Sequence, residues 1–134
     1  MVPGDWYEYF NLGWAHAAAG RVEPAIAAFR EAQQHTTDNS EWVSLGLAYA
    51  FARGNQRDSS FAHLAHIDEA TASYDYSLVL FELGETDRAF AALETSLRRE
   101  SVQLPRMKDD PTAARMLSDR RFAELTQRLG LDRQ

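Results

Sequence analysis

Four side chains of metal-binding type lie close together in the middle of the sequence. His63 and His66 are three residues apart, and Asp68 and Glu69 follow them. Two histidines at this spacing lie on one face of a helix, where they can share a zinc ion. Two ligands do not make a zinc site, however, and the sequence does not identify a third and a fourth. We therefore interpret these side chains as a solvated helix face, and we expect no metal and no cofactor.

Residues that would carry out catalysis are absent or stand in unsuitable contexts. The chain has no cysteine, which excludes disulfides, thiolate zinc sites and cysteine nucleophiles. Its serines, histidines and aspartates form no recognisable nucleophilic motif, and its glycines form no phosphate-binding loop. Asp109 and Asp110 precede Pro111, which is typical of a loop that enters a helix. The sequence therefore predicts a protein that is not an enzyme.

The size and charge of the chain limit its fold and its partners. With 134 residues and 45% hydrophobic side chains, the chain can form one domain, residues 1–134, around its own core. The net charge of −6 argues against nucleic-acid binding, which depends on Lys and Arg at the phosphates. No apolar run approaches the roughly 20 residues of a membrane span, and the first residues lack the features of a secretory signal. We expect a cytoplasmic protein without membrane or nucleic-acid partners.

The elements that carry these residues are predicted to be helices arranged in pairs. Ala25, Phe29 and Ala32 are spaced four and three residues apart, which places them on one stripe of a helix. Gly20 supplies the left-handed residue that separates this helix from the one before it. Related residues return at intervals of about 34, which predicts three helix pairs at about 6–39, 40–69 and 70–100. The positions assigned to helix packing are Leu12, Gly13, Gly20, Ala25, Phe29 and Ala32 in the first copy, Leu45, Gly46, Tyr49 and Gly54 in the second, and Gly84, Ala89 and Leu93 in the third.

This pattern resembles the tetratricopeptide repeat, whose signature contains a Trp or Tyr, a Leu-Gly pair, a Tyr, a Gly, and then Ala, Phe or Leu, and Ala. The first copy follows the signature from Tyr9 and departs from it at His16, where an aromatic side chain is usual. The resemblance implies an all-α fold, a right-handed α-solenoid of about three helix hairpins with a helical cap at residues 101–134. The cap resembles the ending of such domains at the C-termini of bacterial signalling proteins.

The resemblance also implies a peptide-binding groove lined by the first helix of each pair. The residues that map to this groove are Tyr7, Phe10, Asn11, Trp14, Val43, Leu47, Phe51, Tyr74, Leu78 and Phe81. Family members that bind chaperones hold a C-terminal carboxylate with Lys, Asn and Arg in the groove. The corresponding positions here carry no cation and include Asp75, which would repel a carboxylate. We therefore expect no carboxylate clamp.

The expected function is non-enzymatic protein–protein interaction, with a peptide or a partner domain bound in the groove. The sequence leaves three alternatives open. Part of the groove could be core, covered by the chain itself or by its tail. The chain could be a regulatory domain of a larger bacterial signalling enzyme or transcriptional regulator, or it could be a homodimerisation element. The sequence also leaves open whether residues 101–117 lie on the groove or at the end of the solenoid.

Overall fold

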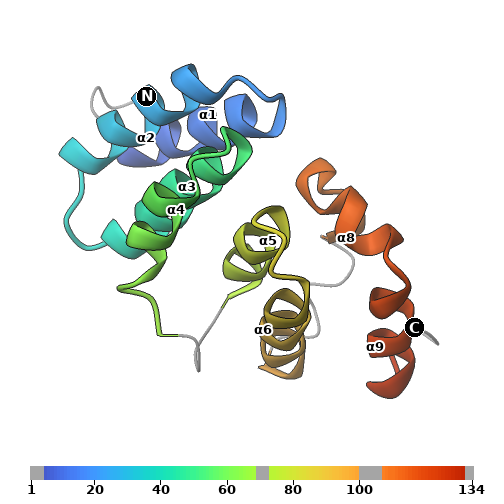
Figure 1. The fold of residues 1–134 in the computed structure, drawn as a ribbon. Coiled ribbons are helices and arrows are strands. Elements are labelled where there is room, and N and C mark those ends of the chain that lie inside the picture. The colour runs from blue at the N-terminus through green and yellow to red at the C-terminus, as the bar shows by residue number, and fades with distance from the viewer. Residues whose placement is uncertain (1–4, 69–72, 100–106, 132–134) are drawn as a thin grey trace. The chain divides into compact units, whose positions relative to one another are not determined.

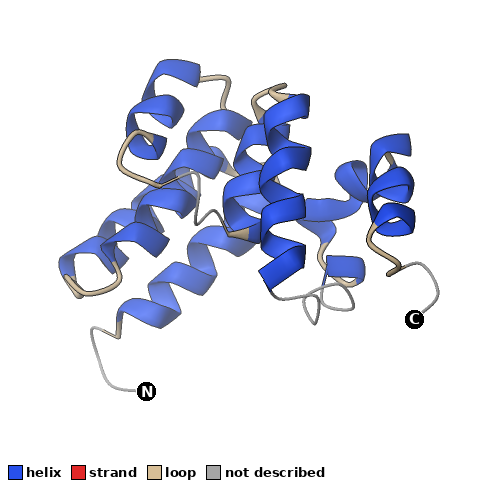
Figure 2. Ribbon diagram, turned by 90° about the horizontal axis from the view of Figure 1, so that it is seen from below, coloured by secondary structure: helices blue, strands red, loops and turns tan. Residues whose placement is uncertain are grey.

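The computed structural model describes residues 5–68, 73–99 and 107–131, and every regular element within these ranges is a helix (Figures 1 and 2). Consecutive helices pack in adjacent pairs, which is the arrangement of a helical-repeat solenoid, so the predicted all-α class is confirmed. None of the described helices is long and apolar enough to cross a bilayer. The chain divides into two compact units, Met1–Ile67 and Asp68–Gln134, and each is described by itself.

The first unit contains two helix pairs. Its helices are α1 (Trp6–Ala18), α2 (Val22–Gln34), α3 (Ser40–Arg53) and α4 (Arg57–Leu64). Asp5 is the N-cap of α1: its side chain accepts a hydrogen bond from the backbone N–H of Tyr7 at 3.0 Å. This N–H has no acceptor within the helix, because it belongs to the first turn. Helix α1 packs along α2, and α3 packs against α1, α2 and α4. Helix α3 is therefore surrounded on several sides.

The turns between paired helices need a residue with a positive φ, and the two turns of this unit meet that need differently. Gly20 has φ +80° after α1, as the sequence predicts. Gly54, predicted to play the same part after α3, has φ −88°, and the left-handed residue is its neighbour Asn55 with φ +61°. Asparagine tolerates this conformation better than most residues. Gly54 is still required by space, because a Cβ there would lie 2.9 Å from Cγ1 of Val22.

The core of the first unit is built around the ring of Phe29. This side chain is fully buried and lies between the glycines of the two Leu-Gly pairs, Gly13 on α1 and Gly46 on α3. A Cβ atom at Gly13 would stand 2.7 Å from the ring, and one at Gly46 would stand 2.3 Å from it. Glycine costs about 1 kcal/mol relative to alanine inside a helix. Both helices carry that cost at the places where the ring needs the space.

The structure corrects the expectation that Leu12 is a core residue. Leu12 is 48% exposed, whereas Leu45, its counterpart in the second copy, is 2% exposed. The difference follows from position along the chain. Helix α3, which carries Leu45, packs against the helix pair that precedes it in the chain. Helix α1, which carries Leu12, is the first described helix and has no preceding described pair to pack against. The Leu-Gly pattern therefore has the same residues in both copies and a different environment in each.

The second unit contains one full helix pair and a helical tail. Its helices are α5 (Tyr74–Glu82), α6 (Thr86–Arg99), the 3-10 turn η2 (Pro111–Ala113), α8 (Ala114–Ser118) and α9 (Arg120–Arg128). Gly84 has φ +82° between α5 and α6, and Gly130 has φ +74° after α9. Asp119 is the N-cap of α9, and its side chain accepts a hydrogen bond from the N–H of Arg121 at 2.9 Å. Residues 101–106 and 132–134 of the predicted cap lie outside the described residues.

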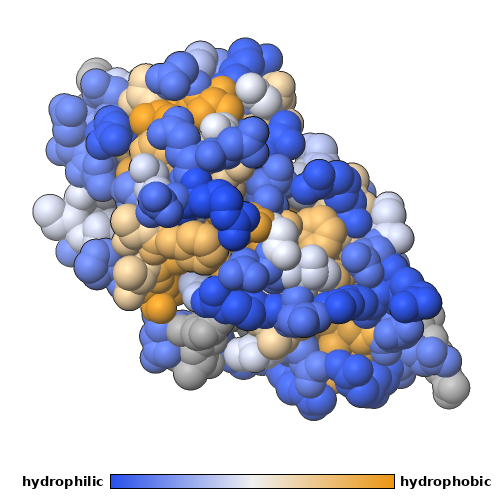
Figure 3. Space-filling view, in the orientation of Figure 1, coloured by the Kyte–Doolittle hydropathy of each residue, from blue (hydrophilic) through white to orange (hydrophobic). Residues whose placement is uncertain are grey.

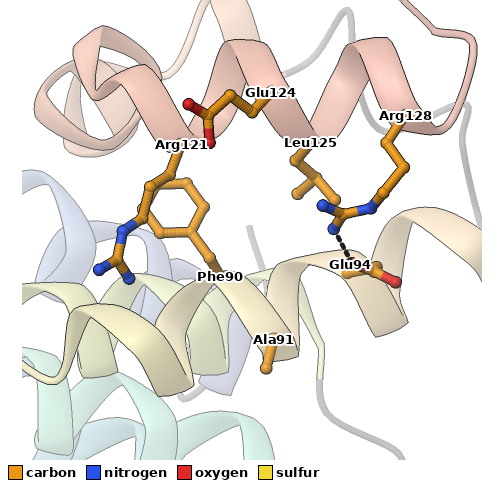
Figure 4. A pocket seen from close by; sticks show the side chains of 7 residues that line it. All are labelled: Phe90, Ala91, Glu94, Arg121, Glu124, Leu125 and Arg128. Atoms are coloured by element: carbon orange, nitrogen blue, oxygen red, sulfur yellow. Dashed lines mark hydrogen bonds and ion pairs between the residues drawn. The ribbon is translucent and has the colours of Figure 1, made fainter.

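The tail packs on the helix pair before it at the spacing of the repeat. Arg121 forms an ion pair with Asp87, and Arg128 forms one with Glu94; the partners of each pair are 34 residues apart. Because the residue numbers rise together on both helices, α6 and α9 run in the same direction (Figure 4). Arg115 of α8 also pairs with Glu82 of α5, 33 residues away, at 3.0 Å. Helices α8 and α9 thus stand to α5 and α6 as a shortened further pair.

Candidate partner-binding surface

Four aromatic side chains of α1 form a continuous row of ring contacts, which we call the α1 aromatic row: Trp6, Tyr7, Phe10 and Trp14. The ring of Trp6 lies 5.6 Å from that of Tyr7 and 5.3 Å from that of Phe10. Tyr7 stacks on Phe10 at 6.3 Å with an interplanar angle of 24°. Phe10 in turn meets the edge of Trp14 at 6.4 Å. These separations lie in the range in which aromatic pairs attract one another.

The α1 aromatic row is anchored in the core of the first unit at one end. Phe10 and Trp14 both pack against Phe29, each with a centroid separation of 6.0 Å. Trp14 also lies 4.9 Å from the ring of Tyr49 on α3. Tyr7, by contrast, is 55% exposed. The row therefore runs from a fixed, packed base to an aromatic side chain that solvent or a partner can reach.

Five of the ten predicted groove residues are accessible to some degree, and five are buried. Tyr7 and Asn11 are exposed, and Phe10, Trp14 and Phe81 are half-buried. The buried ones are Val43, Leu47, Phe51, Tyr74 and Leu78. These five side chains therefore offer little accessible surface to a partner. The accessible members within the first unit all come from α1.

The packing of α3 explains why its predicted groove side is closed. Every residue of α3 from Leu45 to Ala52 is buried, as is Val43. Helix α3 packs against α1, α2 and α4, so few of its positions are left uncovered. Phe51 is further covered by the ring of His63 on α4, at 5.4 Å and an interplanar angle of 30°. The groove residues are assigned by their equivalent positions in each repeat, and that assignment does not take these contacts into account.

The tail covers the corresponding side of α5 within the second unit. The hydroxyl of Tyr74 donates a hydrogen bond to Oδ2 of Asp110 at 2.7 Å. The guanidinium of Arg115 lies over the ring of Phe81, 5.7 Å from its centroid. Burial, together with the hydrogen bond to the Asp110 carboxyl, raises the pKa of the Tyr74 phenol above its ordinary value. For α5, the described part of the tail therefore contacts side chains that the sequence assigned to a groove.

Sequence reasoning missed Trp6 as a member of the aromatic row. Trp6, Phe10 and Trp14 follow one another at intervals of four residues, and this spacing places them along one side of a helix. The signal was therefore present. Hydropathy does not reveal it, because Trp and Tyr do not rank as hydrophobic on the scale of Figure 3, where the face shown is mainly hydrophilic with small hydrophobic patches.

The histidines that could have bound a metal have other surroundings. Nδ1 of His63 lies 2.9 Å from the backbone oxygen of Ser59, and its ring stacks on Phe51. His66 is exposed, and Glu69 lies outside the described residues. Within residues 5–68, 73–99 and 107–131, no three His, Asp or Glu side chains are placed so that they could hold a metal ion.

A second candidate site is a cavity of about 340 Å³ between α6 and α9 (Figure 4). Its lining residues are Phe90, Ala91, Glu94, Arg121, Glu124, Leu125 and Arg128. Each charged side chain in this lining already has a partner of opposite charge within the second unit. Hydrogen bonds from Arg98 and Arg128 lower the pKa of the Glu94 carboxyl below its ordinary value. The geometry is that of a charged contact that fastens α9 to α6, with no unpaired group left for a ligand.

The comparisons with known proteins place the first helix pair in a family. Residues 9–35, which cover most of α1 and all of α2, match the family model of the tetratricopeptide repeat. No curated protein and no solved structure matches the chain. The match includes Gly13, Gly20 and Phe29, whose roles in the packing and in the turn are described above. The first helix pair of this chain is therefore a tetratricopeptide repeat.

Proposed function

We propose that the chain binds a peptide or a partner domain through the α1 aromatic row and the neighbouring Asn11. A tetratricopeptide repeat supports a protein–protein interaction module in general, and the family is a non-catalytic scaffold. The observation that carries the finer proposal is the exposure of Tyr7, which is 55% accessible while its ring stacks on a row fixed in the core. The proposed contact surface is smaller than the ten-residue groove and lies on one helix.

The physical basis is that a rigid aromatic surface binds at low entropic cost. Tyr and Trp side chains have two rotatable bonds, so little freedom is lost when a partner packs on them. Aromatic anchors accordingly dominate the energy of many interfaces. Here Phe10 and Trp14 are held against Phe29 before any partner arrives. A partner that covers Tyr7 would extend packing that already exists.

The test uses a displayed library of random 12-residue peptides, selected on the folded chain. Dissociation constants of the selected peptides are then compared for Tyr7→Ala and Leu12→Ala. Leu12 is a matched control, because it is 48% exposed on the same helix and lies five residues from Tyr7, about 140° around the helix axis. Far-UV circular dichroism establishes that both variants remain helical.

The proposal predicts that Tyr7→Ala weakens the selected peptides by tenfold or more, the effect of a hot-spot residue of about 1.4 kcal/mol or larger. Leu12→Ala should change them by less than about threefold. Equal effects of the two substitutions, or an effect of Leu12→Ala alone, would place binding elsewhere. Sedimentation of both variants checks that self-association does not produce the difference.

A further inference from the structure

We propose that the partner bound by the α1 aromatic row is a peptide segment that carries an arginine, with its guanidinium stacked on Tyr7 and paired with Glu8. This inference rests on the proposed function, because it names the chemistry of the partner at the same surface. Its basis is a contact that the chain makes internally in its second unit.

The internal contact is that of Arg115 with two adjacent residues of α5. The guanidinium of Arg115 lies 5.7 Å from the ring centroid of Phe81, and its Nη2 lies 3.0 Å from Oε2 of Glu82. One arginine thus uses an aromatic ring and the carboxylate that follows it in the sequence. Arginine suits this double contact because its planar cation can stack on a ring while its N–H groups remain free to bind a carboxylate.

Helix α1 has the same pair of side chains without the cation. Tyr7 and Glu8 are adjacent in the sequence, as Phe81 and Glu82 are. Tyr7 and Glu8 are both exposed. Helix α1 contains no Lys or Arg. Within the described part of the chain, no cation lies over the ring of Tyr7 and Glu8 forms no ion pair. An aromatic and acidic pair of the kind that holds Arg115 therefore stands open to solvent.

The charge of the surroundings also favours a cationic partner. The first unit carries seven Asp and Glu residues and four Arg residues. Asp5, which begins α1, adds a second carboxylate directly before the aromatic row. An excess of negative charge raises the local concentration of basic segments and speeds their association, and salt weakens the effect. A neutral or acidic peptide would gain nothing from these carboxylates.

The test starts from the peptides selected out of the random library. We expect those that depend on Tyr7 to be enriched in arginine over the starting library. Replacing that arginine by glutamine should weaken binding by about threefold to tenfold, which is the size of an exposed cation–π contact with an ion pair. Replacement by lysine should be intermediate. Glu8→Gln should weaken the arginine peptide by about threefold and leave the glutamine peptide unchanged.

Glu23→Gln is the matched control for charge. Glu23 is an exposed residue of α2 and forms no ion pair within the described chain, so its substitution should leave the binding of the arginine peptide unchanged. Peptides that depend on Tyr7 but show no arginine enrichment, or an equal effect of Glu23→Gln and Glu8→Gln, would overturn the inference and leave the proposed function standing. A library that yields no Tyr7-dependent peptide would overturn the proposed function, and the inference with it.

Discussion

Gly46→Ala tests the packing of Phe29 between two helices. Alanine is favoured over glycine inside a helix by about 1 kcal/mol, so propensity alone predicts a more stable chain. The added Cβ, however, would lie 2.3 Å from Cε1 of Phe29. The ring cannot move away freely, because it is also packed closely against Gly13, where there is no room for a methyl group. Overpacking of this kind costs about 1–3 kcal/mol, and the short distance places the cost near the upper end.

The expected net result for Gly46→Ala is a loss of about 1–2 kcal/mol in the free energy of unfolding. Tryptophan fluorescence in a urea titration reports this loss directly, since all three tryptophans of the chain lie in the first unit. A variant as stable as the parent, or more stable, would refute the reasoning. In the double variant with Phe29→Leu, the alanine should cost less than it does alone, because the smaller side chain leaves room for the methyl group.

Three further predictions concern other contacts of the fold. Leu45→Ala should lower the free energy of unfolding by about 2–5 kcal/mol in a urea titration, because the Leu45 side chain is buried. Leu12→Ala should lower it by less than about 1 kcal/mol, because the Leu12 side chain is exposed. Tyr74→Phe should lower stability by about 1–2 kcal/mol, measured by thermal unfolding, because it removes the hydrogen bond to Asp110; equal stability would show that this bond contributes nothing. Because folding lowers the pKa of Glu94, the ionised carboxylate stabilises the folded chain at pH values above the pKa of glutamate in the unfolded chain. This stabilisation is lost as the pH falls through the lower pKa of the folded state. Glu94→Gln should therefore make the melting temperature less dependent on pH below about pH 5, and an unchanged pH dependence would contradict the ion-pair assignment.

Much of the helical framework could be predicted, because its signals are local. Gly20 and Gly84 end their helices with the positive φ that the sequence indicates. Phe29 could be recognised as a packing residue from its spacing to Ala25 and Ala32, and all three are buried. These features depend on residues within one or two helical turns, so a pattern in the sequence reports them well.

Most of the parts that could not be predicted depend on residues far apart in the chain. The environment of Leu12 differs from that of Leu45 because of what packs against each helix, and the repeat pattern is the same for both. The burial of Phe51 and Tyr74 depends on contacts with His63 and Asp110 that repeat register does not show. The exchange of roles between Gly54 and Asn55 is a shift of one residue within a turn, where boundaries are hardest to place.

The most direct test of the account follows the three indole N–H signals in a heteronuclear NMR titration with a selected peptide. Trp6 and Trp14 belong to the α1 aromatic row, whereas Trp42 lies on α3 and is 45% exposed, which makes it an internal control. We predict that the signals of Trp6 and Trp14 shift with peptide concentration while that of Trp42 stays in place. Shifts confined to Trp42, or no indole shift at saturating peptide, would contradict binding at the α1 aromatic row.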